Sequence, residues 1–392
     1  MMIVYKFIFS LVAISIFLIA RPIQAQINVS LTGVPTPAIA ARAYVLLDAT
    51  SGQTLTQQAG NDRFEPASLT KLMTAYLTFQ ALKGKKLTLT QTVPVSERAW
   101  RAEGSRMFID PKQKPQVDQL IRGMIIQSGN DASIALAAAI AGSEELFAHM
   151  MNAQAQKLGM QSTRFANATG LPDPQHYTTG EDLAKLADAL IRDFPVEFSY
   201  YKEREYTYNG ITQPNRNRLL WLDAHVDGLK TGHTEAAGYC LIATAKRGEA
   251  DKSRRLIAVV LGTNSDAART QEGQKLLNFG FQFFDTQRLY KKDEAIATPE
   301  IFKGTQPAIK LGFNRDVWLT LPKDKFTGLK ATLTTTQPLL APYSTGQKAG
   351  IMKLTKDDKP IAEIPVVALE NVPVAGFLGR GWDTIRLLFK KD

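Results

Sequence analysis

Hydrophobic and polar residues recur with different periods along the chain, and these periods predict its secondary structure. Residues 43–55 contain an apolar run, a Ser51-Gly52 pair typical of a turn and a second run, which together predict a β-hairpin. Residues 256–262, Leu-Ile-Ala-Val-Val-Leu-Gly, form a continuous apolar run of strand type. Apolar residues recur at helical spacing in four further segments, 68–83, 117–127, 132–141 and 270–284. Strands before and after a helical middle predict a sheet covered by helices.

The pattern changes after about residue 290. Short alternating runs, such as Val-Trp-Leu-Thr-Leu at residues 317–321, are separated there by proline and glycine. We therefore expect a small β-sandwich domain over residues 289–373, preceded by a larger domain over residues 26–288.

The last segment, residues 374–392, has the pattern of an amphipathic helix. One helical face carries apolar side chains and the other carries Arg380, Asp383, Arg386 and Lys390; the apolar residues are Phe377, Leu378, Trp382, Ile385 and Phe389. The segment is too short and too charged to span a bilayer, so we expect a helix that lies in a membrane interface. An amphipathic helix docked on its own protein would show the same pattern.

The first 25 residues resemble a secretory signal. They contain Lys6, an apolar run over residues 7–20 and a cleavage site after Ala25, although an uncleaved membrane anchor is an alternative. Lys6 and Arg21 are the charged residues of this segment, so its removal lowers the formal net charge from +10 to +8. A basic secreted chain without zinc-finger spacing or a dense basic helix argues against nucleic acid and favours acidic lipid or wall polymer.

The composition gives no sign of metal or thiol chemistry. With 392 residues, 44% hydrophobic and 21% charged, the chain is long enough for one large or two unequal domains. Its single cysteine, Cys240, lies in an apolar strand-like run and is expected to be a packed core residue. The four histidines lack metal-ligand spacing, so neither a metal nor another cofactor is expected.

Three short motifs carry the candidate chemistry. They are Ser68-Leu-Thr-Lys71, Ser128-Gly-Asn130 and Lys230-Thr231-Gly232, in this order. The serine and lysine of the first motif lie three residues apart on a predicted helix, so the lysine can act as the base that a serine nucleophile needs. Free N–H groups at the helix start favour an oxyanion there, and burial near a second cation, Lys230, would favour neutral Lys71.

Each motif alone is weak evidence. A Ser-x-x-Lys or a Ser-x-Asn is expected about once in a chain of this length, and a Lys-Thr-Gly in roughly one chain in ten. Alone, the first would indicate a helix N-cap with a solvated lysine, the second a polar turn and the third the start of a strand. Their order, their spacing and the predicted secretion together favour a serine acyl-transfer site.

These motifs resemble those of the low-molecular-mass penicillin-binding D-alanyl-D-alanine carboxypeptidases, which are related to the serine β-lactamases. The resemblance extends to Leu-Ile-Arg-Gly-Met at residues 120–124, Asn-Arg-Asn-Arg-Leu-Leu-Trp at 215–221 and Val-Asp-Gly-Leu before Lys230. It implies an α/β (α+β) penicillin-binding/β-lactamase-like transpeptidase fold with a small C-terminal all-β domain and a terminal amphipathic helix. It also implies release of the terminal D-alanine from peptidoglycan pentapeptides.

The resemblance further implies roles in catalysis. Ser68 would be the acylated nucleophile, Lys71 would take its proton, and Ser128 would relay a proton towards the leaving amine. The backbone N–H groups of Ser68 and His233 would form the oxyanion hole. The His233 side chain is expected to serve packing, with a general base as the alternative.

Other residues would bind the substrate. Asn130 would hold the substrate amide, while Lys230, Thr231 and Thr234 would face its carboxylate and Gly232 would complete the third motif. Arg269 lies where similar enzymes place an arginine that faces the carboxylate, although no motif fixes it. A solvated surface charge is the alternative for Arg269.

Two other functions stay open. A class A β-lactamase usually has Ser-Asp-Asn in the second motif and a Glu-x-x-Leu-Asn loop, whereas this chain has Gly129 and lacks that loop. A membrane-tethered wall-binding module with an idle pocket is the other alternative. The resemblance implies β-lactams as inhibitors, a periplasmic location on the outer face of the inner membrane, and no nucleic-acid partner; a homodimer is one expectation for the oligomeric state.

Overall fold

The computed structural model describes residues 34–249 and 253–389, so the predicted signal segment lies outside the described residues. The chain forms two compact units. Of the described residues, the larger unit comprises 34–249, 253–294 and 315–328, and the smaller comprises 295–314 and 329–389.

A five-stranded antiparallel sheet forms the centre of the larger unit, in the order β2-β1-β7-β6-β5. Its strands are β1 (Ala43–Asp48), β2 (Gln53–Gln58), β5 (Val226–Thr234), β6 (Gly238–Arg247) and β7 (Arg254–Thr263). Strands β1 and β2 form the predicted hairpin, and β7 contains the predicted apolar strand. Both predictions are confirmed.

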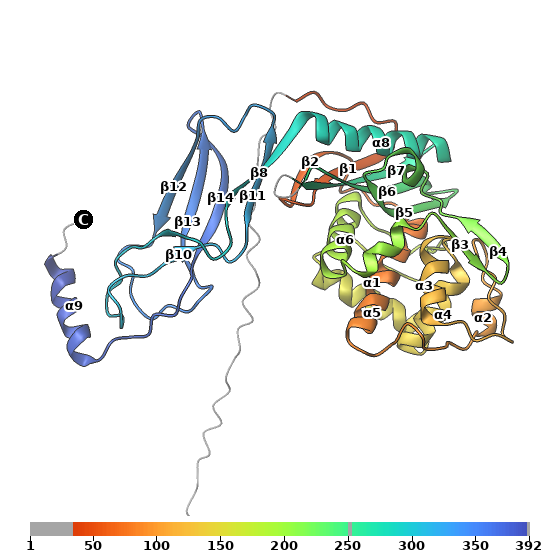
Figure 1. Ribbon diagram of the computed structural model, residues 1–392, viewed down its shortest axis with the longest axis horizontal. Helices are drawn as coiled ribbons and strands as arrows, with labels where there is room; N and C mark the ends of the chain where they lie inside the picture. The colour runs from red at the N-terminus through yellow and green to blue at the C-terminus, as the bar shows by residue number, and fades with distance from the viewer. Residues whose placement is uncertain (1–33, 250–252, 390–392) are drawn as a thin grey trace, which may run out of the picture. The chain divides into compact units, whose positions relative to one another are not determined.

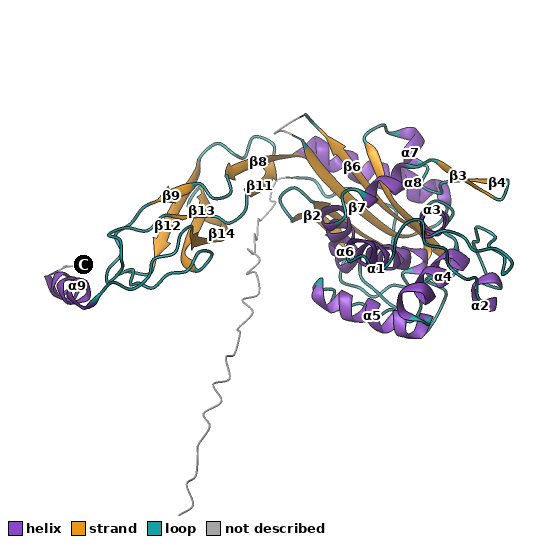
Figure 2. Ribbon diagram, turned by 60° about the horizontal axis from the view of Figure 1, so that its bottom comes forward, coloured by secondary structure: helices purple, strands orange, loops and turns teal. Residues whose placement is uncertain are grey.

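Helices cover both faces of this sheet (Figures 1 and 2). Side chains alternate across strand β1, so Val45 and Leu47 join the core on one face while Tyr44 and Leu46 join the core on the other. The second face is covered by α8 (Asp266–Phe283). The first face is covered by α1 (Lys71–Lys83), α3 (Val117–Ile125), α4 (Asn130–Ala141), α5 (Glu144–Lys157) and α6 (Gly180–Asp193).

Local sequence signals account for the ends of several helices. The hydroxyls of Ser143, Thr179 and Ser265 cap the N-termini of α5, α6 and α8 by accepting hydrogen bonds from backbone N–H groups. Shorter elements complete the unit: η1 (Ala67–Thr70), α2 (Glu97–Trp100), η2 (Glu197–Lys202), β3 (Glu205–Tyr208), β4 (Ile211–Pro214), α7 (Leu219–Leu222), β8 (Phe284–Tyr290) and β11 (Val317–Pro322).

The smaller unit contains one five-stranded sheet, in the order β12-β13-β14-β10-β9, and a terminal helix. The strands are β9 (Ala295–Ala297), β10 (Leu311–Gly312), β12 (Leu329–Thr335), β13 (Lys348–Lys356) and β14 (Lys359–Ala368). Helix α9 (Phe377–Phe389) confirms the helix predicted at the C-terminal end.

The structure divides the chain differently from the boundary predicted between residues 288 and 289. That boundary falls inside β8, which pairs with β11, and both strands belong to the larger unit. Thr320 of β11 is tied to this unit because its hydroxyl lies 3.0 Å from the buried Asp48 carboxylate and its N–H donates to Gln53. The smaller unit contains one five-stranded sheet, and β8 and β11 form a separate two-stranded sheet, so a β-sandwich over residues 289–373 stays a prediction.

Two further observations bear on the predictions. Cys240 is buried in β6, where its sulfur accepts a hydrogen bond from Gly262 N–H, so the packed-core prediction is confirmed. Within the described ranges, no single helix has both the length and the apolar character to cross a membrane; only the bent pair of α4 and α5 meets these criteria together. Both of these helices contribute buried residues to the core.

Candidate active site

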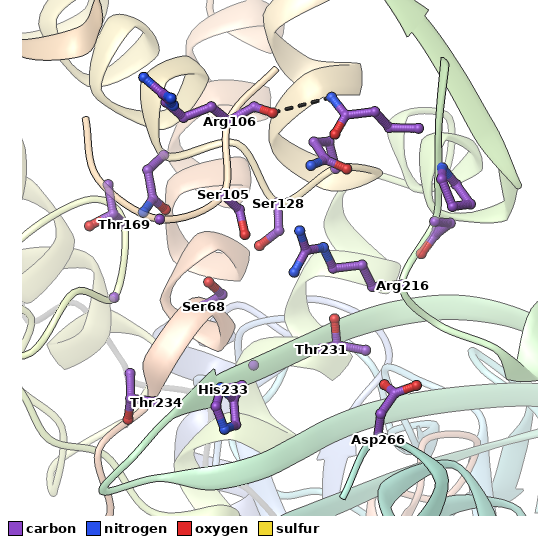
Figure 3. Close-up of a pocket in the computed structure, with 18 of the residues that line it drawn as sticks. Ser68, Ser105, Arg106, Ser128, Thr169, Arg216, Thr231, His233, Thr234 and Asp266 are labelled. Carbon is purple, nitrogen blue, oxygen red and sulfur yellow. Dashed lines mark hydrogen bonds between the residues drawn. The ribbon is translucent and has the colours of Figure 1, made fainter. Parts of the chain in front are cut away.

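The first motif lies at the start of helix α1, below a cavity of about 940 Å³ in the larger unit (Figure 3). Ser68 is in the short turn η1, and Lys71 is the first residue of α1. The Lys71 Nζ lies 2.9 Å from Ser68 Oγ and 2.6 Å from the carbonyl oxygen of Thr169. Lys71 is 1% exposed, so its amine contacts the serine from inside the protein.

The second and third motifs meet beside Ser68. Ser128 precedes helix α4, and Lys230 lies on strand β5, at the edge of the sheet. The Lys230 Nζ donates to Ser128 Oγ over 2.9 Å and to the Thr231 carbonyl over 2.9 Å. The structure thus brings together three motifs that are separated by 60 and 102 residues in the sequence.

The backbone is strained where the two serines are presented. Ala67, just before Ser68, has φ 47°, and Ser128 has φ 67°, although side chains disfavour this region. Gly170 packs so closely on this turn that a Cβ there would lie 1.7 Å from the Ala67 carbonyl oxygen. Such strain is found preferentially at functional sites, because the surrounding structure must hold it.

Burial, and then the positive charge of Arg216, lower the pKa of Lys71 to about 7, although Asp131 and Glu144 act in the opposite direction. A substantial fraction of Lys71 is therefore neutral at neutral pH, which a general base requires. Burial also lowers the pKa of Lys230, with smaller contributions from Lys71, Arg216 and Arg269. Lys71 and Lys230 thus interact, as sequence analysis expected, and Arg216 is a further cation that lowers the pKa of both.

Most of the predicted site residues line the cavity: Ser68, Ser128, Asn130, Thr231, Gly232, His233, Thr234 and Arg269. Lys71 and Lys230 lie behind this lining and reach it through the two serines. Asn130 donates to the Glu103 carbonyl over 2.6 Å, whereas its buried Oδ1 has no partner among the described residues. That oxygen can accept a hydrogen bond from a ligand N–H.

His233 and Thr234 end strand β5. The exposed His233 ring packs on Tyr239 with 4.0 Å between the ring centroids, as expected for a packing role. The Thr234 hydroxyl donates to the Glu65 carboxylate over 3.2 Å and accepts from Ala237 N–H over 3.0 Å. A ligand carboxylate at Thr234 would therefore compete with Glu65.

Arg269 is buried, which excludes the alternative of a solvated surface charge. Its guanidinium donates to the Gly232 carbonyl over 3.1 Å and pairs with Asp266. These contacts tie helix α8 to strand β5. Arg269 therefore lines the cavity as a cation that already has a carboxylate partner.

Sequence analysis missed Arg216 as a site residue. Its side chain points towards Ser128 and Thr231 in Figure 3. Its backbone is fixed by buried neighbours, because Asn215 donates to the Glu203 carbonyl and Asn217 donates to the Gly228 carbonyl. Asn215 and Asn217, which flank Arg216 in the sequence, are the signal that could have indicated Arg216 as a site residue.

This geometry meets the requirements of serine acyl transfer, since it combines a hydroxyl, a lysine with a lowered pKa beside it, and a second serine-lysine pair. Within residues 34–249 and 253–389, no cluster of histidine, cysteine, aspartate and glutamate could hold a metal ion.

Comparisons with known proteins agree with this class. Residues 30–265 match the family described as D-alanyl-D-alanine carboxypeptidase, and residues 284–374 match the C-terminal domain of penicillin-binding protein 5. The D-alanyl-D-alanine carboxypeptidase DacC of Escherichia coli is 43% identical over 364 residues, which cover 91% of this chain and 90% of DacC. The chain belongs to the D-alanyl-D-alanine carboxypeptidase family.

Solved structures show the same fold. Penicillin binding protein 5 from Haemophilus influenzae superposes with a TM-score of 0.83 at 39% identity, covering 87% of this chain and 100% of that one. Penicillin-binding protein D2 from Listeria monocytogenes, solved in its ampicillin-bound form, gives a TM-score of 0.58 at 32% identity over 63% of this chain and 100% of its own. These findings favour the carboxypeptidase over the β-lactamase and the idle wall-binding module.

Proposed function

We propose that this protein is a serine-type carboxypeptidase that removes the terminal D-alanine from peptidoglycan pentapeptides through an acyl-enzyme on Ser68. The observation that carries the proposal is the contact between Lys71 and Ser68. The amine lies 2.9 Å from the hydroxyl, and its pKa is lowered to about 7. A base within hydrogen-bond reach and with a pKa near the working pH is what activation of a serine requires.

In the acylation step, Ser68 Oγ attacks the carbonyl carbon of the last peptide bond while Lys71 Nζ takes the hydroxyl proton. The N–H groups of Ser68 and His233 would stabilise the oxyanion. The C–N bond then breaks as the proton held by Lys71 passes through Ser128 to the leaving D-alanine amine, which returns Lys71 to its neutral form; the Ser128 hydroxyl lies 2.9 Å from Lys230 Nζ. This step leaves an ester between Ser68 and the shortened peptide.

In the second step, water attacks the ester carbonyl. One proton of the water passes to Lys71 and then to Ser68 Oγ as the ester bond breaks, which restores the hydroxyl and releases the shortened peptide. The Thr169 carbonyl accepts a hydrogen bond from Lys71 Nζ over 2.6 Å, which supports this role because it orients the amine towards Ser68 in both steps.

The lining of the cavity supports recognition of a peptide with a free carboxylate. The unpartnered Oδ1 of Asn130 suits a substrate amide N–H. Lys230, Thr231 and Thr234 would face the terminal carboxylate, and Arg216 adds positive charge near Thr231 (Figure 3). A β-lactam carries the same kind of acyl group, so we also propose that penicillin acylates Ser68.

We further propose that the protein works in the periplasm, attached peripherally to the outer face of the inner membrane. The predicted signal segment supports secretion. Helix α9 supports the attachment, because Phe377, Leu378 and Phe389 are 83%, 86% and 82% exposed. Its charged side contacts its own unit, since Arg386 pairs with Glu300, so the alternative of docking through the apolar face is not favoured.

The test of the catalytic proposal uses the purified chain without its signal segment and a pentapeptide that ends in D-Ala-D-Ala. Mass spectrometry should detect free D-alanine and the tetrapeptide, and a penicillin adduct should map to Ser68. The Ser68→Ala variant should lose both turnover and adduct. Turnover or labelling that persists in this variant would show that another residue is the nucleophile.

A further inference from the structure

The loop before helix α4 forms one wall of the cavity and is held rigidly. Asp131 is 1% exposed, and its carboxylate accepts hydrogen bonds from the N–H groups of Met107, Phe108 and Ile109 over 2.8 to 3.2 Å. The N–H of Asn130 donates to the Ser105 carbonyl over 2.7 Å. Each of these bonds uses the loop backbone; the side chains of Met107 and Ile109 are buried in the core, whereas Arg106 and Phe108 line the cavity.

Arg106 lies in the middle of this loop. Its carbonyl accepts a hydrogen bond from Gln213 of strand β4 over 3.2 Å, drawn as the dashed line in Figure 3, so the backbone of Arg106 is fixed from both sides. Its guanidinium lies over the Phe108 ring, 5.2 Å from the centroid. The loop therefore presents a half-buried cation at a defined place on the cavity wall.

The arginines of the cavity differ in their partners. Arg218 and Arg269 both pair with Asp266, the acidic residue of the lining. Among the described residues, no ion pair with a carboxylate is found for Arg106 or Arg216. Two cations in the cavity are thus available to anionic groups of a ligand.

The two available cations lie on different sides of the nucleophile. In the view of Figure 3, Arg216 lies beside Ser128 and Thr231, whereas Arg106 lies on the other side of Ser128, above Thr169. Under the proposed function, the leaving residue and its carboxylate occupy the side of Thr231 and Arg216. The rest of the peptide then extends to the side of Arg106.

We propose that Arg106 is a specificity-determining residue that favours peptides with a carboxylate on the side chain before D-Ala-D-Ala. This inference rests on the proposed function, because it assumes that Ser68 attacks the bond between the last two residues. A planar guanidinium can bind a carboxylate through two parallel hydrogen bonds, and the fixed loop reduces the entropy lost on binding.

The test compares two matched peptides in which only the charge differs. One is N-acetyl-L-2-aminopimelyl-D-Ala-D-Ala, whose long flexible side chain ends in a carboxylate, and the other is its side-chain amide. The wild-type enzyme should hydrolyse the carboxylate peptide with a kcat/KM about two- to fivefold higher, as expected for a partly screened ion pair. This ratio should fall towards one at high salt.

Substitutions at Arg106 test whether this residue causes the preference for the carboxylate peptide. The Arg106→Gln variant should bring the ratio to about one, and Arg106→Lys should keep part of the preference because it retains the charge. Arg101→Gln is the matched control, since Arg101 is exposed, pairs with Glu97 outside the cavity and should leave the ratio unchanged.

The outcomes separate the two proposals. A ratio near one in the wild-type enzyme, or a ratio that Arg106→Gln leaves unchanged, would overturn the role of Arg106 while D-alanine release still supports the carboxypeptidase. Absence of D-alanine release from both peptides would instead overturn the proposed function.

Discussion

The Ser68 cavity and helix α9 place charged and apolar groups in opposite ways. Below the cavity, the cationic side chains of Lys71 and Lys230 are 1% and 2% exposed and contact serine hydroxyls. On α9, large apolar side chains face outward, while the charged side chain of Arg386 is paired with Glu300 of the same unit. Burial of amines and exposure of large apolar side chains both lower the stability of the folded protein, so each region keeps an arrangement that folding alone disfavours.

The difference shows two ways in which an unfavourable arrangement can serve function. A buried amine loses hydration, and the protein responds by lowering its pKa, which converts an ordinary cation into a base. An exposed apolar face keeps its contact with water, and this contact becomes useful when another apolar phase covers it. The first arrangement suits chemistry inside the protein, and the second suits the proposed attachment to a membrane surface.

The largest effect should follow from removing the base while keeping its charge. Arginine stays protonated, so Lys71→Arg should lower kcat/KM for D-alanine release by about 10²- to 10⁴-fold. The same substitution at Lys83, at the other end of helix α1, is the control and should leave the rate near normal. A near-normal rate for Lys71→Arg would show that another group takes the proton from Ser68.

Changes on α9 should separate attachment from catalysis. Trp382→Glu removes an apolar side chain worth about 1.5–3 kcal/mol when fully buried, so vesicle binding should weaken about tenfold or more in a flotation assay. Truncation before Val374 should abolish binding, whereas hydrolysis of a small peptide should stay intact. Because the apolar contribution dominates, high salt should release little protein.

The control for Trp382→Glu introduces the same negative charge on α9, outside the apolar face of the helix. Thr384 donates its hydroxyl hydrogen bond to the Arg380 carbonyl, and Thr384→Glu should weaken binding less than Trp382→Glu. Equal binding by the full-length and truncated chains would place the membrane contact elsewhere. Loss of peptide hydrolysis on truncation would favour a helix that supports its own protein.

A smaller effect should follow from filling the space between Gly170 and the Ser68 turn. A Cβ at Gly170 would lie 1.7 Å from the Ala67 carbonyl oxygen, so Gly170→Ala should destabilise the protein by about 1–3 kcal/mol and slow penicillin acylation. Gly142 is the control, because it also has a positive φ but no atom within 4 Å of its added Cβ. Gly142→Ala should cost about 1 kcal/mol or less and leave acylation unchanged.

Thermal unfolding and stopped-flow acylation measure these two effects separately. If both alanine variants lost the same stability and acylated at the wild-type rate, the contact between Gly170 and Ala67 would have no part in positioning the nucleophile. Strain from the backbone conformation alone would then account for the loss of stability.

The smallest effect concerns the pH dependence of acylation. Neutral Lys71 is the active form, so kcat/KM should fall about tenfold per pH unit below about 7 and level off above it. Arg216 lowers the pKa of Lys71, so Arg216→Gln should move this limb to higher pH, while Arg101→Gln should not. A limb that stays in place or moves to lower pH would exclude an electrostatic role for Arg216.

The fold and the nucleophile were predictable because local signals specify them. The Ser51-Gly52 turn specifies the first hairpin, and apolar periodicity specifies α1, α3, α4 and α8. The three motifs predicted one site because this combination of residue types, in this order, is typical of serine acyl transfer. The alternating pattern of β11, in contrast, does not reveal that this strand pairs with β8 within the larger unit.

The remaining parts of the site depend on tertiary structure. The carbonyl of Thr169 contacts Lys71, but a backbone carbonyl is present in every residue and has no sequence signature. Arg216 affects the pKa of Lys71 from a distant segment, and charge proximity across the fold cannot be deduced from spacing. The positive φ of Ser128 likewise follows from how the chain enters α4, beside a glycine that suggested only a turn.

The charged side of α9 determines how force would pass through this end of the molecule. The Asp383 carboxylate accepts a hydrogen bond from Lys303 N–H, and Arg386 pairs with Glu300 and lies over the Phe302 ring. These contacts fix the helix to the smaller unit as a rigid body, in contrast to a flexible tether. Tilting of the helix in a bilayer would therefore tilt the attached β-sheet by the same angle.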